Sequence, residues 1–190
     1  METIVETSPS HAGPVWQGTW PSEADTVAFA TRLAASPAIT NATLTLHGDL
    51  GAGKTTFVRH LLRALGVKGR IKSPTYAVVE PHEALPCPLM PAGEPLRIWH
   101  FDFYRFTDPR EWEDAGFREL FASPGLKLVE WPERAAGYLP PIDAELHLHA
   151  QDMPHAQTPD LEDGIAPARG VAFHAKSPVG QQLLSALNAP

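Results

Sequence analysis

The sequence predicts one α/β domain, with a mainly parallel central sheet, an antiparallel hairpin portion and helices on both faces of the sheet. Two observations predict this class. Short apolar runs typical of strands alternate with amphipathic runs typical of helices, and this alternation favours a sheet that is covered on both faces. The chain has 190 residues, 43% of them apolar, which is enough for one core but leaves no room for a second catalytic domain.

The first half of the chain predicts a helix, a strand and a second helix, in that order. SEADTVAFATRLA at 22–34 begins with a candidate N-cap serine and early acidic residues, so it predicts a helix. ATLTLHGD at 42–49 is typical of a strand. KTTFVRHLLRALG at 54–66 places its large apolar residues on one helical face and is expected to end at Gly66.

The second half continues the alternation. Strands are expected at 75–80 and 96–105, joined as a hairpin by a proline-rich loop. DPREWEDAGFRELF at 108–121 predicts a helix with Asp108 as its cap and proline at its first position. Three further strands and a closing helix are expected after it, at 126–131, 144–150, 170–176 and 179–188.

Prolines indicate where the ordered core ends. The chain has 20 of them, about twice the usual share, and they are clustered. Proline removes a backbone donor and restricts the residue before it, so these clusters predict loops or frayed ends. We expect one domain over residues 1–190, with its core at about 20–176 and flexible segments at 1–15, 83–95 and 151–168.

Charge and cysteine content exclude several classes of protein. The 22 acidic residues outnumber the 15 Lys and Arg, so the net charge is -7 and the whole chain would be repelled by nucleic acid or an anionic membrane. The single Cys87 excludes an intrachain disulfide framework and fits a reducing compartment. The acidic N-terminus does not resemble a signal peptide, and no apolar run is long enough for a membrane span. We therefore expect a cytoplasmic protein with no membrane segment.

The stretch GDLGAGKTTF at 48–57 matches the P-loop pattern G-x-x-x-x-G-K-[ST] through Gly48, Gly53, Lys54 and Thr55. Glycines let the backbone wrap around phosphates, so that N–H groups and a helix N-terminus face the anion. Lys54 would reach the β- and γ-phosphates, and the Thr55 hydroxyl would bind Mg²⁺. With a predicted strand before it and a helix after it, the stretch predicts nucleotide binding and a P-loop NTPase fold. The alternative is a degenerate loop without a ligand.

Hydrolysis requires more than a P-loop, because the metal needs a carboxylate and the attacking water must be positioned. Glu130 ends the apolar run LKLVE, where a Walker-B-type carboxylate would hold Mg²⁺. Most such strands end in Asp, so Glu130 is a departure from the pattern, and a solvated acid at a strand end is the alternative.

A second candidate lies in HFDFYR at 100–105. Period-two alternation places His100 and Asp102 on one face of a strand and the phenylalanines on the other, where they predict core positions. Asp102 could act as a general base or as a water-mediated Mg²⁺ ligand, and Arg105 could neutralise phosphate or hold a partner. A purely structural polar face is the alternative for both residues.

A third candidate is KSPTY at 72–76, which follows the P-loop helix. Many NTPases carry a loop that senses the γ-phosphate at this place, and Thr75 is its candidate hydroxyl. A plain Ser-Pro turn is the alternative.

Basic residues gather around the predicted phosphate site. Between Asp49 and Glu80 there is no acidic residue, whereas six of the 15 basic residues fall there, namely Lys54, Arg59, Arg63, Lys68, Arg70 and Lys72. Part of this charge compensates the nucleotide and part is a solvated helix face. The excess could also bind RNA or an acidic protein surface.

The histidines do not predict a metal site. His147 and His149 lie on one face of the strand expected at 144–150, but the sequence shows no cysteine or further convergent ligand beside them. We expect exposed strand positions.

The motifs taken together resemble one family. GDLGAGKTTF, KSPTYAVVEP, HFDFYR and LVEWPER, in this order and spacing, closely resemble the TsaE (YjeE) family of small bacterial P-loop ATPases, over a span from about Trp20 to Lys176. The resemblance implies ATP hydrolysis that is weak alone and useful in a complex with TsaB and TsaD. That complex forms threonylcarbamoyladenosine at adenosine 37 of tRNAs that read ANN codons. By the same resemblance, TsaD would perform the transfer and the ATPase would reset the complex. The ATPase would contact tRNA only indirectly, through the complex.

The resemblance also implies roles for individual residues, with ATP and Mg²⁺ as cofactors. Lys54, Asp102 and Glu130 would be catalytic, Thr55 and Glu130 would hold Mg²⁺, and Trp131 would lie beside the metal carboxylate. The implied nucleotide contacts are Glu23, Gly48, Asp49, Gly51, Ala52, Gly53, Lys54, Thr55, Thr56, Thr75 and Arg169.

Two other functions remain open on the sequence. A stand-alone P-loop kinase for a small molecule would need an acceptor pocket and usually a lid with arginines. The 83–95 loop contains no Lys or Arg, which counts against this function. A nucleotide-dependent binding module would hydrolyse ATP only incidentally. The roles of Asp102 and Glu130 discriminate these functions from a partner-stimulated ATPase.

Overall fold

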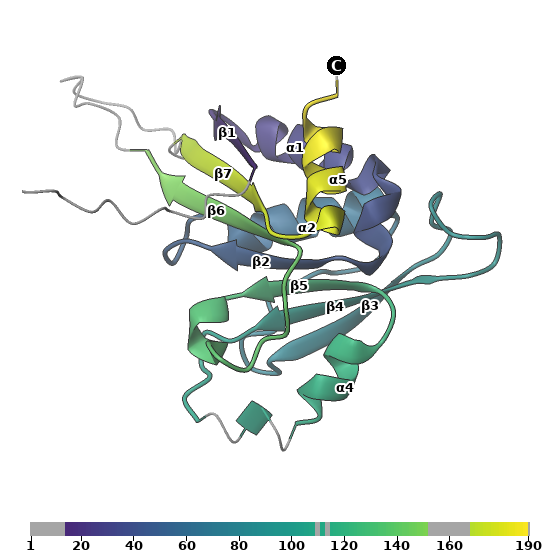
Figure 1. The fold of residues 1–190 in the computed structure, drawn as a ribbon, viewed down its shortest axis with the longest axis vertical. Helices are drawn as coiled ribbons and strands as arrows, with labels where there is room; N and C mark the ends of the chain where they lie inside the picture. Colours follow the sequence, from purple (N-terminus) through teal and green to yellow (C-terminus); the bar gives the residue numbers. More distant parts are fainter. Residues whose placement is uncertain (1–13, 109–110, 113–114, 152–167, 190) are drawn as a thin grey trace, which may run out of the picture.

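The computed structural model describes residues 14–108, 111–112, 115–151 and 168–189. These residues form a seven-stranded sheet in the order β1-β7-β6-β2-β5-β4-β3 (Figure 1). The strands are β1 (Val15–Trp20), β2 (Thr43–His47), β3 (Val79–Ala84), β4 (Leu96–Asp102), β5 (Leu126–Glu130), β6 (Ala144–Ala150) and β7 (Arg169–Ala175). The helices are α1 (Glu23–Ala35), α2 (Lys54–Leu65), α4 (Phe117–Ala122) and α5 (Pro178–Leu187), with 3₁₀ turns η1 (Pro37–Asn41) and η2 (Pro132–Ala135).

Parallel strands form the centre of the sheet and antiparallel strands its edges. β2 pairs in parallel with β5 and β6, and β5 pairs in parallel with β4. β3 is antiparallel to β4 at one edge, while β7 and then β1 continue antiparallel from β6 at the other. The expected hairpin and the predicted fold class are confirmed. Because the central strands are parallel, their carboxyl ends share one edge of the sheet, where open α/β sheets place their ligands.

Two apolar layers cover the sheet, and the alternation along β4 separates them. Ile98 belongs to the larger cluster, which α1, α2 and α5 complete. Trp99 and Phe101 point to the other face and pack with the α4 residues Phe117 and Phe121. The two phenylalanines of HFDFYR, Phe101 and Phe103, are therefore core residues, as predicted. The two layers lie on opposite sides of the sheet in Figure 1.

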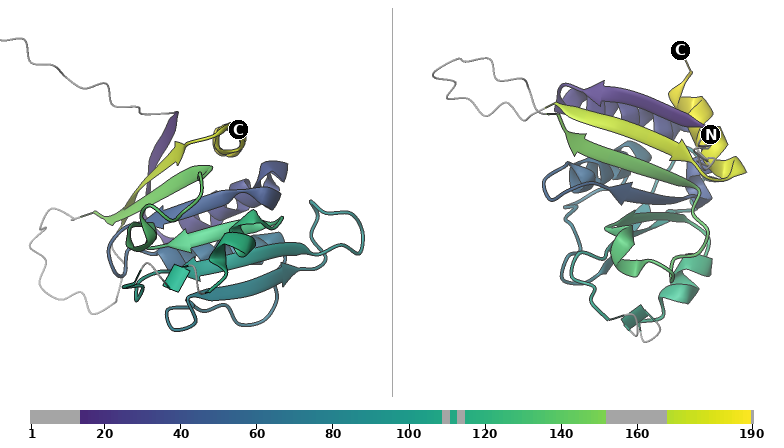
Figure 2. Two further views of the ribbon diagram at one scale, coloured as in Figure 1. Left: turned by 60° about the horizontal axis from the view of Figure 1, so that its bottom comes forward. Right: turned by 60° about the vertical axis from the view of Figure 1, so that its left-hand side comes forward.

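The second layer is incomplete. α4 and η2 lie over the half of the sheet formed by β3, β4 and β5, whereas the right-hand view of Figure 2 shows β1, β7 and β6 in front of α1, with no described helix over their outer face. Alternate residues of β6 are accordingly buried toward the helices and partly exposed on the other face. Half of one sheet face is thus open to solvent or to a partner.

Several boundaries differ from the sequence-based expectation. Strand β1 was not expected, although its alternating tryptophans, Trp16 and Trp20, pack on Phe29 in the large core. The strand expected at 75–80 begins later, at Val79, and continues through Pro81 into the expected loop. Pro81 is tolerated because β3 is the edge strand of the sheet. The strand expected at 96–105 ends at Asp102.

The helix expected at 108–121 is interrupted. Glu111 and Trp112 are helical, but Gly116 adopts a left-handed conformation with φ of 67° and caps a separate helix, α4. Glycine takes this conformation without steric cost, so it ends one helical turn and starts the next. The expectation that Pro109 opens this helix falls outside the described residues.

The proline-rich segments have different outcomes. The expected flexible segments 1–15 and 151–168 lie almost entirely outside the described residues. The 83–95 segment is anchored, because Ala84 and Cys87 are buried in the larger core and Leu89 and Met90 pack against it. In the described ranges, no helix combines the length and apolarity that a membrane crossing requires.

Candidate functional site

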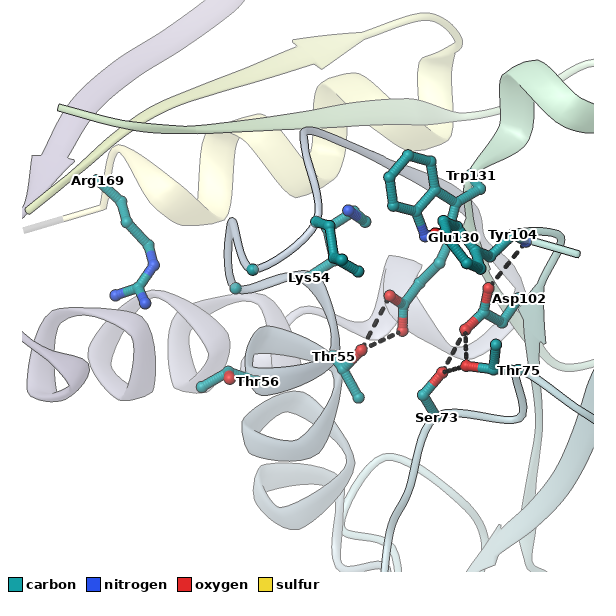
Figure 3. A pocket seen from close by; sticks show the side chains of 13 residues that line it. Lys54, Thr55, Thr56, Ser73, Thr75, Asp102, Tyr104, Glu130, Trp131 and Arg169 are labelled. Carbon is teal, nitrogen blue, oxygen red and sulfur yellow. Dashed lines mark hydrogen bonds between the residues drawn. The ribbon is translucent and has the colours of Figure 1, made fainter. Parts of the chain in front are cut away.

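A cavity of about 310 Å³ lies at the carboxyl edge of the central strands (Figure 3). Its volume is at the lower end of the range for small-molecule sites. The predicted site residues that line it are Gly51, Gly53, Lys54, Thr55, Thr56, Thr75, Asp102, Glu130 and Arg169. The P-loop, the 72–76 loop and the ends of β4, β5 and β7 therefore meet here, as the motifs predict.

The P-loop glycines are required by backbone geometry. Gly48, Gly51 and Gly53 have φ values of 136°, 82° and 105°, which side-chain-bearing residues rarely adopt. A Cβ on Gly48 would also lie 2.2 Å from the carbonyl oxygen of Leu148 in β6, whereas a Cβ on Gly51 would meet open space. Gly48 thus allows the P-loop to pass close to the backbone of β6 as it leaves β2. Gly53 allows α2 to begin at the cavity.

Lys54, the first residue of α2, is held over the loop. Only 4% of it is exposed, and its ammonium donates to the carbonyl oxygens of Gly48 and Asp49, the latter at 2.9 Å. It also lies 3.9 Å from the ring centroid of Trp131, in cation–π geometry. Burial lowers the pKa of Lys54 from its ordinary value, and nearby Glu130 opposes this shift.

Thr55 and Glu130 are in direct contact. The Thr55 hydroxyl lies 2.9 Å from both carboxylate oxygens of Glu130, which is 2% exposed. His100 approaches the same carboxylate from β4, with Nε2 at 2.8 Å from Oε1. Glu130 is the register partner of Leu46 in β2, so it lies beside the P-loop strand as predicted. Glu130 is therefore a buried carboxylate with two side-chain partners, Thr55 and His100. The alternative of a solvated acid at a strand end is excluded.

These oxygen atoms suit a small hard cation. A hydroxyl and a carboxylate at one point are the donors that Mg²⁺ uses in phosphate-binding proteins, where waters and phosphate oxygens supply the remaining ligands. The predicted metal pair, Thr55 and Glu130, is therefore brought together with a fitting donor set.

Asp102 lines the same cavity and forms hydrogen bonds to the 72–76 loop. Its carboxylate accepts hydrogen bonds from the hydroxyls of Ser73 and Thr75, the latter at 2.9 Å, and from the Tyr104 amide at 3.0 Å (Figure 3). It is 3% exposed and is the register partner of Glu130. The loop is thus more than a Ser-Pro turn, because the hydroxyls of Ser73 and Thr75 are both bound to the acid predicted for hydrolysis.

Two strained residues flank this part of the cavity. Val78 and Trp131 have φ values of 66° and 56°, and they are the non-glycine residues with positive φ in the described parts of the chain. Left-handed geometry is unfavourable for residues with a Cβ and is rare for a β-branched one. The Val78 backbone is fixed on both sides, since its N–H donates to Pro74 O and its carbonyl accepts from the Asp102 amide.

Arg169 and Glu23 have different outcomes as expected nucleotide contacts. Arg169 begins β7 and reaches the P-loop, where its Nε donates to Ala52 O at 2.9 Å and its side chain lines the cavity. Glu23 does not line this cavity; its carboxylate lies 2.6 Å from Nε2 of His60 on α2.

The remaining charged candidates lie at the rim and outside it. The Arg105 guanidinium stacks on exposed Tyr76 at 4.4 Å from the ring centroid, rather than lining the cavity. Four of the six basic residues from the P-loop helix region line a neighbouring hollow with Thr55 and Ser73, namely Arg59, Arg63, Arg70 and Lys72. Arg63 is partly structural, because it donates to the carbonyl oxygens of Val67 and Gly69.

Comparison with known proteins identifies the family. The family model "Threonylcarbamoyl adenosine biosynthesis protein TsaE" matches residues 20–158. The chain belongs to the TsaE family. A protein named tRNA threonylcarbamoyladenosine biosynthesis protein TsaE from Haemophilus influenzae is 36% identical over 143 residues, which are 75% of this chain and 76% of that protein. A protein of the same name from Bacillus subtilis is 36% identical over 125 residues, 66% of this chain and 70% of that protein.

A solved structure supports the fold of this TsaE family member. The crystal structure of YdiB from Bacillus subtilis matches with a TM-score of 0.65 and 23% identity, over 94% of this chain and 97% of that one. At this identity the likeness concerns the fold alone.

Three residues of the TsaE site were not assigned a role from the sequence. Ser73 binds Asp102, His100 binds Glu130, and Tyr104 lies 5.0 Å from Trp131 between ring centroids. The alternation of side chains in HFDFYR did place His100 on the same strand face as Asp102, and this placement could have indicated a role for His100 in the site. The contact itself depends on the pairing of β4 with β5, which is not local in sequence.

Proposed function

We propose that this TsaE family member is an ATP hydrolase that works with TsaB and TsaD in forming threonylcarbamoyladenosine in tRNA, and that hydrolysis resets their complex. It would act in the cytoplasm. The observation that carries the proposal is the direct contact of the P-loop Thr55 with a buried carboxylate, Glu130, in one cavity with a second buried acid, Asp102. A module that only bound nucleotide would not need the second acid.

The P-loop would hold the triphosphate. Positive φ at Gly51 and Gly53 and the start of α2 at Lys54 present backbone amides and a helix N-terminus to an anion. Lys54 would exchange the carbonyls of Gly48 and Asp49 for phosphate oxygens, which are stronger partners for an ammonium. Arg169 would add positive charge on the β7 side of the cavity.

Thr55 and Glu130 would hold Mg²⁺. When bound, the ion would neutralise charge on the phosphates. Within the chain, Thr55 and Glu130 present three oxygen atoms at one place, and His100 fixes the carboxylate by bonding Oε1. Hydrogen bonds from neighbouring residues to metal ligands orient those ligands.

Asp102 would orient or deprotonate the attacking water. A general base must lie within hydrogen-bond reach of the proton it accepts, and Asp102 lines the phosphate cavity with Glu130 as its neighbour on β5. Its bonds to Ser73 and Thr75 couple this role to the 72–76 loop, so a γ-phosphate that attracted the Thr75 hydroxyl would also release one bond to the acid.

The rim of the cavity suits contact with a partner. Leu50 and Tyr76 are 77% and 85% exposed, and Tyr104 is also exposed. Leu50 and Tyr104 line the cavity mouth, so a partner that covered these residues would also cover the nucleotide. Such closure would explain activity that is weak alone and stimulated in a complex.

The geometry also bears on the kinase alternative. The connection between β3 and β4 precedes β4, so it lies at the edge of the sheet opposite to the end of β4 that carries Asp102 (Figure 1). It is also anchored by buried Cys87. This connection is therefore poorly placed to act as a lid over the phosphates.

The test is ATP hydrolysis by the full chain, alone and with TsaB, TsaD and tRNA. We expect slow turnover alone and stimulation by the partners. Asp102→Ala should lower the stimulated rate by at least about 100-fold, the usual contribution of a general base, and leave ATP affinity nearly unchanged. Glu94→Gln, which changes an acid in the β3–β4 connection, is the matched control.

Two outcomes would overturn the proposal. Absence of stimulation under every combination of partners and tRNA would contradict the role in the complex. Unchanged turnover in Asp102→Ala would favour a nucleotide-dependent binding module.

A further inference from the structure

The open half of the sheet carries a compact group of histidine and carboxylate side chains. The potential ligand atoms of His47, Glu145 and His147 all lie within 4.8 Å of one another. The side chains of His147 and Glu145 are 41% and 23% exposed, so the group is accessible from solvent. The proposed ATPase does not use these residues.

Strand pairing assembles the group. His47 and His147 are register partners on the parallel strands β2 and β6, and their rings stack with centroids 4.3 Å apart. Glu145 lies two residues before His147 and therefore on the same face of β6. Its register partner on β7 is His174, whose ring centroid lies 5.1 Å from that of His147. Adjacent strands bring such partners to about 4.5–5.5 Å between Cβ atoms, so all four side chains share one patch.

We propose that His47, His147 and Glu145 form a binding site for one divalent transition-metal ion of the Zn²⁺ class, with His174 placed to complete the coordination. Two imidazoles and one carboxylate are a recognised three-ligand set for zinc, which leaves a further position for water, a substrate or a fourth side chain. Mg²⁺ prefers oxygen ligands and would bind poorly here.

The ligands are close but need a small rearrangement. Nitrogen and oxygen ligands bind Zn²⁺ at about 2.0–2.2 Å, so two ligand atoms of one tetrahedral ion lie about 3.4 Å apart. Rotation of the two stacked imidazole rings would shorten the present distances between the ligand atoms to this value. The rings now have weaker partners, since His47 Nε2 lies 2.9 Å from the Thr45 hydroxyl and His147 Nε2 lies 3.2 Å from Glu145.

A basic neighbour opposes metal binding at one of the three ligands. Lys176 donates to Glu145 at 3.0 Å and competes with a cation for this carboxylate. Removal of the Lys176 charge should therefore strengthen metal binding.

The site is separate from the nucleotide cavity. Glu130 is the register partner of Leu46, so it points to the same face of the sheet as Leu46. His47 follows Leu46 and points to the opposite face. The two sites adjoin in the sequence, because His47 directly precedes Gly48 of the P-loop.

The test is calorimetric titration of the untagged full chain, without nucleotide, with ZnCl₂ as the probe. We expect saturable binding of one ion per chain. His147→Ala and Glu145→Gln should each weaken binding at least about tenfold, because even groups that only support a ligand contribute 10–100-fold. Lys176→Gln should bind more tightly than the wild type, and MgCl₂ should not compete.

Two variants serve as controls for Zn²⁺ bound elsewhere. His60→Ala removes a histidine that pairs with a carboxylate on another part of the surface, and Glu130→Gln alters the nucleotide cavity. Both should bind Zn²⁺ as the wild type does. Binding that survives His147→Ala and Glu145→Gln, or that disappears in Glu130→Gln alone, would overturn the proposal.

A second measurement needs no variant. With CoCl₂ in place of zinc, the wild-type chain should show visible absorption of four- or five-coordinate cobalt, and the ring nitrogen resonances of His47 and His147 should shift on addition of ZnCl₂. Octahedral cobalt absorption with unshifted ring resonances would contradict the site.

Discussion

The cavity that we propose for the nucleotide lies between the P-loop on one side and the 72–76 loop with the ends of β4 and β5 on the other. These two walls have the same unusual backbone conformation, but in residues of different kinds. On the P-loop wall, positive φ falls on glycines, which adopt it without cost. On the opposite side it falls on Trp131, which lines the cavity, and on Val78, which bonds the backbone of the lining residue Asp102. Positive φ costs about 1–3 kcal/mol at each of these residues. The first wall is therefore relaxed, while the second is held in place by its contacts. The difference means that the P-loop carries no backbone strain of this kind, whereas the opposite side of the cavity stores strain that its hydrogen bonds hold in place.

The largest expected effect concerns the relaxed wall. Gly48→Ala should lower the free energy of unfolding by more than about 3 kcal/mol and abolish nucleotide binding, because the new methyl group would clash with the β6 backbone. Gly51→Ala, which meets open space, should cost only about 1–2 kcal/mol for its left-handed backbone. Urea unfolding and nucleotide titration would measure both. Equal effects at the two positions would show that backbone strain, and not the packing on β6, governs this wall.

A smaller effect should come from the buried pair of His100 and Glu130, because Glu130 is one of the two residues that we propose to hold Mg²⁺. His100→Leu leaves the Glu130 carboxylate without one partner in a fully buried position, and should cost about 1–3 kcal/mol of stability. His100→Gln, which can still donate, should retain most of it. The informative measurement is the Mg²⁺ concentration needed for tight ATP binding, which should rise in His100→Leu. An unchanged Mg²⁺ requirement would mean that His100 only fills space.

The strained wall can be probed at two adjacent valines. Val79→Gly in β3, where the backbone is extended, should cost about 2 kcal/mol through lost burial and added chain entropy. Val78→Gly loses a similar side chain but relieves left-handed strain, so its net change should stay within about 1 kcal/mol. Equal losses measured by thermal unfolding would refute the claim that Val78 is strained.

The smallest expected effect is a pH dependence of the folding stability that originates at His82. Burial lowers the pKa of His82 in β3, with Glu80 opposing the shift and His100 adding to it. The folded protein then holds His82 neutral while the unfolded chain takes up a proton below about pH 6.5, so stability falls as the pH falls through this value. His82→Leu should weaken this loss, and the gap between variant and wild type in urea unfolding should widen from pH 7 to pH 5. A gap that stays constant would exclude His82 as a source of acid sensitivity.

The sequence predicts local and motif-based features of this molecule well. The P-loop, the helix after it and the acid at the end of β5 depend on residue types at fixed spacing, and Gly53, Lys54 and Glu130 lie where the motifs place them. Alternation along β4 likewise separated the core aromatics from Asp102. These features follow from the geometry of a single strand or turn.

Features that depend on pairing between distant strands could not be predicted. The contact of His100 with Glu130 needs the register of β4 on β5, and the group of His47, His147 and Glu145 needs that of β2 on β6. His147 alone gave no signal of a metal site because, although Glu145 lies two residues before it, His47 is remote in sequence. The strain at Val78 is also invisible in the sequence, because tertiary contacts impose it against the preference of a β-branched residue.

The bond from Arg169 to the P-loop has a consequence for the order in which the protein is made. Arg169 and Ala52 are separated by 117 residues, and Gly48 rests on the β6 backbone at Leu148. A growing chain therefore displays the complete P-loop motif long before the strands that support it have left the ribosome. During synthesis the nucleotide site would be finished among the last parts of the domain, and a chain that ended before β7 would carry the motif without its support.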